Sequence, residues 1–267
     1  MTGSVWRDAR GRPITFDALM NRAATGRVVL LGERHDRADH HRWQLHVAAA
    51  LLSRRPVTLG FEMFPATANP VLAEWVMGGL SEDSFLDRSG WAKSWGFAAD
   101  LYLPIFRFCR EMRVPMVGLN VQRDLVRAVG ADGWDKAPDT LKEDLTRPLP
   151  SSMAYRRFIF ELTGGQRPGR KAQSAEDPAF DSFMRAQEVW DRAFATRLAR
   201  VATADPARLA VGIIGMGHLQ FGGGVSWQLT DLGIADSLAL IPRDAGEVAV
   251  PFAADASMEL PGRGDAP

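Results

Sequence analysis

Five short apolar runs constrain what this chain can fold into more than any other feature of its sequence. None of them alternates apolar with polar residues, as a strand with one solvent-exposed face would. Each run therefore predicts a parallel strand that is covered on both sides. The runs are Val28–Leu31, Val57–Phe61, Met116–Leu119, Leu209–Ile214 and Leu238–Ile241. Together they predict an α/β fold with a mostly parallel sheet flanked by helices.

Helical periodicity occupies the segments before or between several of these runs. Asp39–Ser53 carries a single apolar stripe, and Asp39 is a candidate N-cap for that helix. Val28–Phe61 thus predicts a β-α-β unit, which we expect to be right-handed. Tyr102–Arg113 predicts a second helix, which leads into the strand that begins at Met116.

The middle of the chain differs from its flanks in composition. It is rich in Pro, Gly and charged residues from Gly130 to Pro178. Short helical pieces are predicted at Asp139–Leu145 and Met153–Leu162, followed by a long amphipathic helix at Asp177–Val201. This change in composition indicates a separate helical part of the fold.

A chain of 267 residues can form one large domain or a core domain with an insertion. We predict an α/β core made of residues 1–129 and 201–250. Residues 130–200 are predicted to form a smaller helical subdomain inserted late in the chain. We expect a weakly ordered tail at residues 251–267.

Charge and cysteine content exclude several classes of protein. Lys+Arg and Asp+Glu are balanced at 32 each, so no bulk field favours nucleic acid or an anionic membrane. The single Cys109 excludes an intrachain disulfide and a multi-cysteine metal site. No apolar run approaches the roughly 18–20 residues of a transmembrane helix. As given, the chain is expected in the cytoplasm, or in the periplasm or at a membrane if an export signal was removed.

Polar side chains follow four of the predicted strands at the point where each strand ends. Glu33 and His35 follow the first strand, Glu62 the second and Asn120 the third, while His218 follows the fourth across a Gly-Met-Gly turn. In an open parallel sheet, ligands bind outside the carboxyl ends of the strands. The sequence therefore predicts one shared site with two carboxylates, two imidazoles and an amide.

Other aromatic and imidazole side chains allow two interpretations. Tyr102 and Tyr155 each begin a predicted helix, where they serve either aromatic packing or ligation of a haem iron as phenolates. His40 and His41 lie in the first turn of a predicted helix and either face the site or face away from it. Their spacing does not match the i,i+4 pair of a helical metal site.

Ordered motifs along most of the chain resemble the ChaN-like haem-binding family, described in bacteria as iron-regulated proteins associated with haem uptake. The motifs are Val29–Asp36 with His40-His41, Gly60–Phe64, Trp95, Tyr102–Ile105, Asn120 with Arg123, Ala186-Gln187 with Trp190-Asp191, Gly215–His218 and Gly224-Val225. The resemblance implies a three-layer α/β domain with a smaller helical domain, and haem bound in a homodimer with two haems stacked face to face.

The resemblance also implies which residues bind the cofactor. A tyrosine ligates each iron in the family, so Tyr102 is the first choice of haem ligand here and Tyr155 is the reserve. Further cofactor-binding candidates are His35, His40, His41, Asn120, Arg123 and His218. The preferred hypothesis is a haem-binding protein for haem or iron uptake or handling, binding haem through a tyrosine at a dimer interface.

The Glu-x-His and Gly-x-Gly-His motifs are similar to those of a wider group that includes erythromycin-esterase-like and TIKI-like hydrolases. This similarity implies an alternative function, a hydrolase of the esterase or metal-dependent peptidase type. Glu33 or Glu62 would act as general base, and His35 or His218 as its partner or as ligand of a divalent metal.

Overall fold

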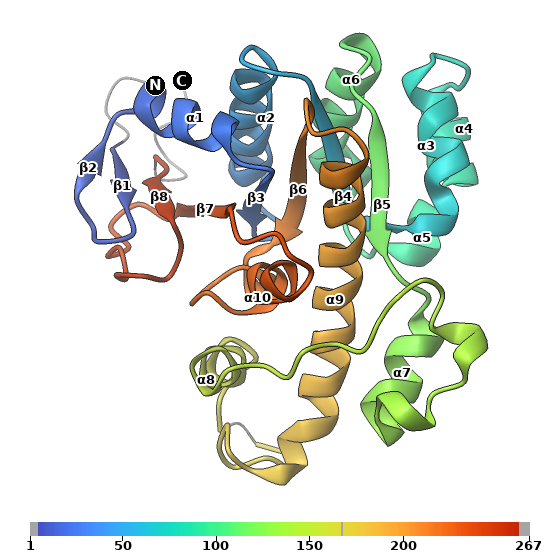
Figure 1. Ribbon diagram of the computed structural model, residues 1–267, viewed down its shortest axis with the longest axis vertical. Coiled ribbons are helices and arrows are strands. Elements are labelled where there is room, and N and C mark those ends of the chain that lie inside the picture. Colours follow the sequence, from blue (N-terminus) through green and yellow to red (C-terminus); the bar gives the residue numbers. More distant parts are fainter. Residues whose placement is uncertain (1–4, 167, 262–267) are drawn as a thin grey trace.

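An eight-stranded sheet forms the centre of the computed structural model, which describes residues 5–166 and 168–261 (Figure 1). All five predicted strands belong to this sheet, and each is one to four residues longer than predicted. They are β3 (Val28–Glu33), β4 (Val57–Pro65), β5 (Met116–Asn120), β6 (Leu209–Gly215) and β7 (Ser237–Arg243). The sheet also contains β1 (Trp6–Asp8), β2 (Pro13–Ile14) and β8 (Ala256–Glu259), which we did not predict.

Most strands of the sheet run parallel, as predicted. The strand order is β2-β1-β8-β7-β3-β6-β4-β5, and the pairs from β8 to β5 are all parallel. Only β1 pairs antiparallel, with β2 and β8. Strand β6 lies between β3 and β4, although it comes far later in the chain. The register places Glu33 beside Gly215, so the carboxyl ends of these strands meet.

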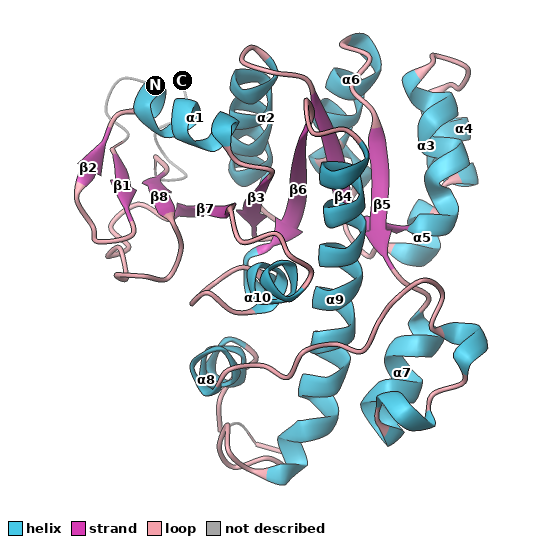
Figure 2. Cartoon of the chain, in the orientation of Figure 1, coloured by secondary structure: helices cyan, strands magenta, loops and turns pink. Residues whose placement is uncertain are grey.

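Helices cover both faces of the sheet (Figure 2). Successive residues of a strand point to opposite faces, so Val29 and Leu31 join one apolar core while Val28 and Leu30 join the other. The first face carries α1 (Phe16–Thr25), α2 (Ala38–Leu52), α3 (Asn69–Val76) and α6 (Leu103–Glu111), and the second carries α7 (Arg123–Asp132), α9 (Asp181–Ala204) and α10 (Gly224–Asp231). Among the described residues, no helix is long and apolar enough to cross a membrane.

The long helix α9 is shared between the sheet and a smaller helical lobe. Its later residues, such as Phe194 and Leu198, pack in the core against the sheet. Its first residues extend past the sheet and enclose a separate apolar cluster with α8 (Met153–Leu162) (Figure 1). Ser152 caps α8 by accepting a hydrogen bond from the backbone of Tyr155. The predicted helical subdomain thus has a small core of its own, while its limits at residues 130 and 200 stay a prediction.

Two helix boundaries differ from the prediction for identifiable reasons. Asp39 does not cap α2, because the preceding Arg37 is the N-cap residue and Asp39 instead accepts a hydrogen bond from the Arg37 guanidinium at 2.9 Å. The helix predicted at Asp139–Leu145 is a single 3-10 turn at Asp139–Leu141. Pro148 and Pro150 closely follow that turn, and the chain continues there without regular structure.

Both ends of the described chain belong to the sheet-bearing part. Residues 256–259 form β8, so the expectation of weak order from residue 251 is wrong for them, while residues 262–267 lie outside the described residues. Helices α4 (Glu82–Arg88) and α5 (Trp91–Ser94) were also missed. These elements are short, and their stability comes from contacts with distant segments rather than from local periodicity.

Truncating α1 tests whether the N-terminal segment is part of the core. Met20 on α1 is fully buried, whereas Met112 is 56% exposed. We expect Met20→Ala to lower the free energy of unfolding by about 2–5 kcal/mol, because it leaves a cavity. Met112→Ala, the matched control, should change it by less than about 0.5 kcal/mol. Equal midpoints for the two variants in urea unfolding would show that α1 is not packed as described.

Candidate functional site

The carboxylate of Glu33 forms the deepest part of the site. It is the last residue of β3, and its side chain is completely buried. One carboxylate oxygen lies 2.7 Å from Nδ1 of His35, and the other lies 3.3 Å from Nε2 of His41. The hydroxyl of Tyr102 donates to the same carboxylate at 3.1 Å. Glu33 thus fixes the orientation of three ring side chains around it.

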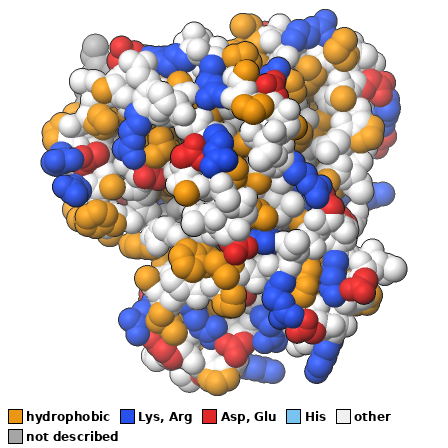
Figure 3. Space-filling view, in the orientation of Figure 1, with side chains coloured by type: hydrophobic (Ala, Val, Ile, Leu, Met, Phe, Trp, Pro, Cys, Tyr) orange, Lys and Arg blue, Asp and Glu red, His pale blue; other side chains and the backbone are white. Residues whose placement is uncertain are grey.

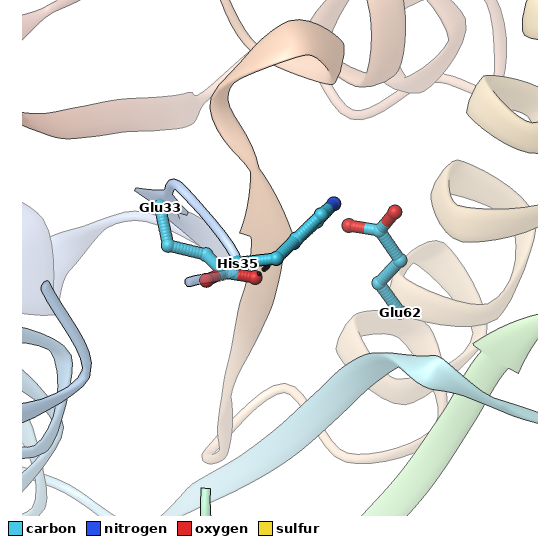
Figure 4. Close-up of side chains that lie close together, drawn as sticks. All are labelled: Glu33, His35 and Glu62. Atoms are coloured by element: carbon cyan, nitrogen blue, oxygen red, sulfur yellow. Dashed lines mark hydrogen bonds and ion pairs between the residues drawn. The ribbon is translucent and has the colours of Figure 1, made fainter. Parts of the chain in front are cut away.

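His35 lies between two carboxylates (Figure 4). One ring nitrogen contacts Glu33, and the other points toward Glu62. Burial by itself would lower the pKa of His35, but the hydrogen bond to Glu33 and the negative charges of Glu62 and Glu33 outweigh burial and raise the pKa to about 9. The imidazole is therefore protonated near neutral pH. Trp95 packs edge-on against it, with ring centroids 4.7 Å apart.

A second imidazole, His218, is held by a buried carboxylate on α9. Its Nδ1 lies 2.6 Å from Oδ1 of Asp191 and 3.0 Å from the amide of Gln187. Burial would lower the pKa of His218, but the charges of Asp191 and Glu62 prevail and raise it. The hydroxyl of Tyr155 donates to the Gly217 carbonyl at 2.8 Å and lies 3.1 Å from Asp191 Oδ2.

Glu62 connects the two imidazoles. One oxygen accepts a hydrogen bond from the Gly215 backbone at 2.6 Å, and the other lies 3.6 Å from Nε2 of His218. A Cβ at Gly215 would lie 2.8 Å from the His35 ring, so a side chain at this position would displace His35 from its place beside Glu62. We call Glu33, His35, Glu62, Asp191 and His218 the central cluster. It is a row in which carboxylates alternate with imidazoles.

Two cavities meet at the central cluster, and His35, Phe97 and His218 line both of them. The first cavity, of about 780 Å³, lies between α8 and the loop that joins β7 to β8. The second cavity, of about 650 Å³, lies on the side of β4, β5 and the start of α7. Both volumes are within the range of about 300–1,000 Å³ that is typical of small-molecule sites.

Hydrophobic side chains dominate the surroundings of the first cavity. The molecule narrows between the sheet-bearing part and the lobe that contains α8, and hydrophobic side chains gather at this narrowing (Figure 3). The apolar side chains that line the cavity include Phe158, Ile159, Leu162, Met216, Phe221, Ile241, Val248 and Val250. Several of them are exposed, Val248 to 81% and Leu162 to 55%. Such a hollow favours a ligand with a large apolar surface.

Glu33, His35 and Glu62 can also hold a cation. One ligand atom from each of them lies within 4.8 Å of the others. Two carboxylates and one imidazole are a donor set that suits a divalent metal. Among residues 5–166 and 168–261, no other group of three or more His, Cys, Asp or Glu side chains has ligand atoms this close together.

The structure brings the predicted strand-end residues together, as their positions in the sequence indicate. Glu33, His35, Glu62 and His218 meet within the central cluster. Asn120 lines the second cavity. Its side-chain amide donates a hydrogen bond to the backbone carbonyl of Glu62 at 2.7 Å and so fixes the backbone at Glu62. Arg123 also lines the second cavity.

The predicted tyrosine ligands lie elsewhere. Tyr102 and Tyr155 are fully buried and line neither cavity. Burial raises the pKa of both phenols, and the charges of Glu33 and Asp191 raise it further, so both remain protonated. In this conformation the Tyr102 hydroxyl donates to Glu33, and the Tyr155 hydroxyl donates to the Gly217 carbonyl beside Asp191. The geometry therefore gives no support to a tyrosine as iron ligand.

His40 and His41 also take part in packing. His41 lies against Glu33 and lines neither cavity, and Nδ1 of His40 accepts a hydrogen bond from the Arg34 backbone at 3.1 Å. Asp191 and Gln187 hold His218, yet we did not identify them as site residues. A buried acid within the apolar stripe of a long helix is the signal that identifies Asp191.

Comparison with known proteins identifies relatives of this chain. A family model described as "Haem-binding uptake, Tiki superfamily, ChaN" matches residues 19–229. The structure is similar to ChaN of Campylobacter jejuni, solved with cofacial haem binding, at a TM-score of 0.73 and 16% identity, with 96% of each chain covered. No curated protein matches the chain.

Two further solved structures match this one at lower scores. The type III effector HopBA1 matches at a TM-score of 0.51 and 13% identity, with 92% of each chain covered. A mutant of the erythromycin esterase EreC matches at 0.49 and 14%, covering 95% of this chain and 82% of its own. The family model confirms the expected resemblance to the ChaN family. The similarity to HopBA1 concerns the fold alone, and the match to EreC carries no further conclusion.

The raised pKa of His35 predicts how stability depends on pH in metal-free protein. The folded pKa of about 9 exceeds the unfolded value of 6.5, so this stabilisation is complete below pH 6.5 and is lost as the pH rises through about 9. We expect His35→Gln to cost about 1–3 kcal/mol at pH 6 and much less at pH 9.5, as measured by urea unfolding in EDTA. The same substitution at exposed His46 is the control. A pH-independent cost at His35 would contradict the assignment.

Proposed function

Because the chain belongs to the ChaN family of haem-binding uptake proteins, we propose that it binds haem as a cargo for uptake or handling. The observation that carries this proposal is the first cavity, an apolar hollow with two imidazoles at its inner end. Burial of the porphyrin faces against its apolar walls supplies the main favourable free energy. The two imidazoles bring nitrogen donors to the same hollow.

His35 is the residue that we propose as the axial ligand of the haem iron. Its Nδ1 is held by Glu33, so Nε2, which faces Glu62, is the nitrogen that would bind the iron after it loses its proton. A carboxylate behind a ligating imidazole fixes its orientation and increases its basicity, which is the usual arrangement at metal sites. His35 is also more accessible than His218, with 30% of its side chain exposed against 12%.

A tyrosine ligand, as the family resemblance implies, would require a different conformation. Tyr102 would have to give up its hydrogen bond to Glu33, and Tyr155 its bonds to Gly217 and Asp191. Either phenol would also have to lose a proton, and burial with nearby carboxylates raises the pKa of both above the usual value for a phenol. His35 must lose a proton as well, but its pKa is only about 9. We therefore place the iron at His35 and use the tyrosines to test this choice.

A homodimer around the haem is part of the proposal. Apolar side chains near the first cavity remain exposed on this chain, among them Val248, Val250 and Leu162. Exposed apolar groups that gather around a ligand hollow favour burial by a partner surface. A second copy that presents the same rim would cover the outer face of the porphyrin.

A hydrolase is the second candidate function, and a specific arrangement favours it. Asp191 holds His218 in one orientation, and Nε2 of His218 faces Glu62. An imidazole that is oriented by one carboxylate and faces another is an arrangement used in general acid–base catalysis. Glu62 would activate water for attack on an ester or amide, with or without a divalent metal at Glu33, His35 and Glu62.

Haemin titration tests the first function. We expect the native protein to shift the Soret band at a defined stoichiometry, because the iron gains an imidazole ligand. His35→Ala should abolish that spectrum, whereas Tyr102→Phe and Tyr155→Phe should keep it. Sedimentation of the same samples reports whether haem drives dimerisation. Loss of the spectrum in Tyr102→Phe but not in His35→Ala would reverse the ligand assignment, and no shift in native protein would exclude haem binding.

Turnover of model esters and peptides tests the second function. If Glu62 is the general base, Glu62→Gln should lower kcat by about 100-fold or more, because the amide is isosteric but not basic. Asp124→Asn, an exposed acid at the edge of the second cavity, provides the matched control. Turnover at the uncatalysed rate in native protein, with and without added Mn²⁺ or Zn²⁺, would exclude a hydrolase that acts on these substrates.

A further inference from the structure

The second cavity has no role in the haem proposal, yet it is almost as large as the first. It lies on the other side of His35 and His218, at the ends of β4 and β5. Residues 89–97 form one wall, and the first turn of α7 forms another. Its inner end is the central cluster, so a molecule bound there would contact Glu62 and both imidazoles.

Two cations distinguish this cavity from the first one. Lys93 and Arg123 both line it and are exposed, and neither forms an ion pair among residues 5–166 and 168–261. Arg123 donates to the Ser94 carbonyl at 3.0 Å, which places its guanidinium beside the wall that carries Lys93. Positive charge from two separate elements thus converges on one cavity.

The other arginines in comparable positions are already neutralised. Arg127, one turn further along α7, pairs with Asp124. At the first cavity, Arg34 pairs with Asp244, and Arg243 lies 3.7 Å from Glu259. The positive charge at the second cavity therefore remains available to a ligand, and a charge-assisted hydrogen bond to an anion would satisfy it.

The rest of the second cavity is aromatic and apolar, with Glu62 at its inner end and a second acid, Asp124, at its edge in an ion pair with Arg127. Trp95, Phe97 and Trp190 supply ring faces and edges for an apolar body. Glu62 at the inner end repels an anion, so the charged group of a ligand would lie at the mouth, near Lys93 and Arg123.

We propose that the second cavity binds a small molecule with an aromatic or apolar body and one carboxylate or phosphate group. Lys93 and Arg123 hold the anionic group, and the aromatic side chains hold the body. This site is separate from the haem cavity, although both are lined by His35 and His218. It gives the central cluster a second ligand on its other side.

Calorimetric titration with three probes that share a naphthalene body tests this proposal. The probes are 2-naphthoate, 2-naphthyl phosphate and the neutral 2-naphthalenemethanol. We expect at least one anionic probe to bind about tenfold or more tightly than the alcohol. Comparison of the two anions then distinguishes a carboxylate ligand from a phosphate ligand. Equal affinity for all three probes, or no binding of either anion, would overturn the proposal.

Variants locate the binding and separate it from haem. Lys93→Gln and Arg123→Gln should each weaken the preferred anion about three- to tenfold and leave the alcohol unchanged. Arg157→Gln, whose charge is paired with Glu176 away from this cavity, is the matched control and should weaken neither. An equal loss in Arg157→Gln would contradict the assignment, because the effect would then reflect net charge alone.

The two cavities are distinguished with haem-loaded protein. If they are separate, haem-loaded and haem-free protein should bind the anionic probe with affinities that agree within about twofold, and Lys93→Gln should leave the haemin titration unchanged. Displacement of the probe by haem would mean that the cations serve the haem propionates, and would overturn a separate site. A protein that fails to bind haem but binds the probe would refute only the haem proposal.

Discussion

The position of the Glu62 carboxylate between two imidazoles is the constraint on which the rest of the site depends. A carboxylate buried to this extent is costly unless it is paired and hydrogen-bonded, and both requirements are met at Glu62. The imidazoles need partners in turn, which Glu33 and Asp191 provide. Each charge in the central cluster therefore requires its neighbour, and removal of one leaves another buried and unpaired.

This requirement explains features of the structure that are otherwise unrelated. Gly215 must lack a side chain, because a Cβ would collide with the His35 ring. Gly224 has a φ of +56°, and a Cβ there would lie 2.1 Å from the His218 carbonyl. The two tyrosines occupy the remaining acceptor positions of Glu33 and Asp191, which makes them part of the support for the imidazoles. The motifs that identify the family are thus also the motifs that build the central cluster.

The central cluster forms the partition between two cavities of different chemical character. Apolar side chains surround the first cavity, and the second combines aromatic side chains with two unpaired cations. A haem carrier needs only one such cavity, and a hydrolase needs a path for substrate to reach its base. The two cavities, on either side of one row of carboxylates and imidazoles, support the proposal that the protein binds its cargo beside a second, anionic ligand.

The sequence by itself determined the parallel strands, the helices α2, α6, α8 and α9, and four members of the central cluster. It could do so because buried strands appear as short apolar runs, and because polar residues at their carboxyl ends must meet at one edge. It also identified the family, through motifs at the ends of those strands.

Only the tertiary structure decided the roles of those residues. The insertion of β6 between β3 and β4 brings His218 beside Glu62, and no local pattern encodes a pairing across some 150 residues. Asp191 joins the cluster because α9 crosses the sheet at this point, and Tyr102 becomes a donor to Glu33 because its helix packs there. A sequence records which groups are present, whereas burial and distance decide which are paired and which are free for a ligand.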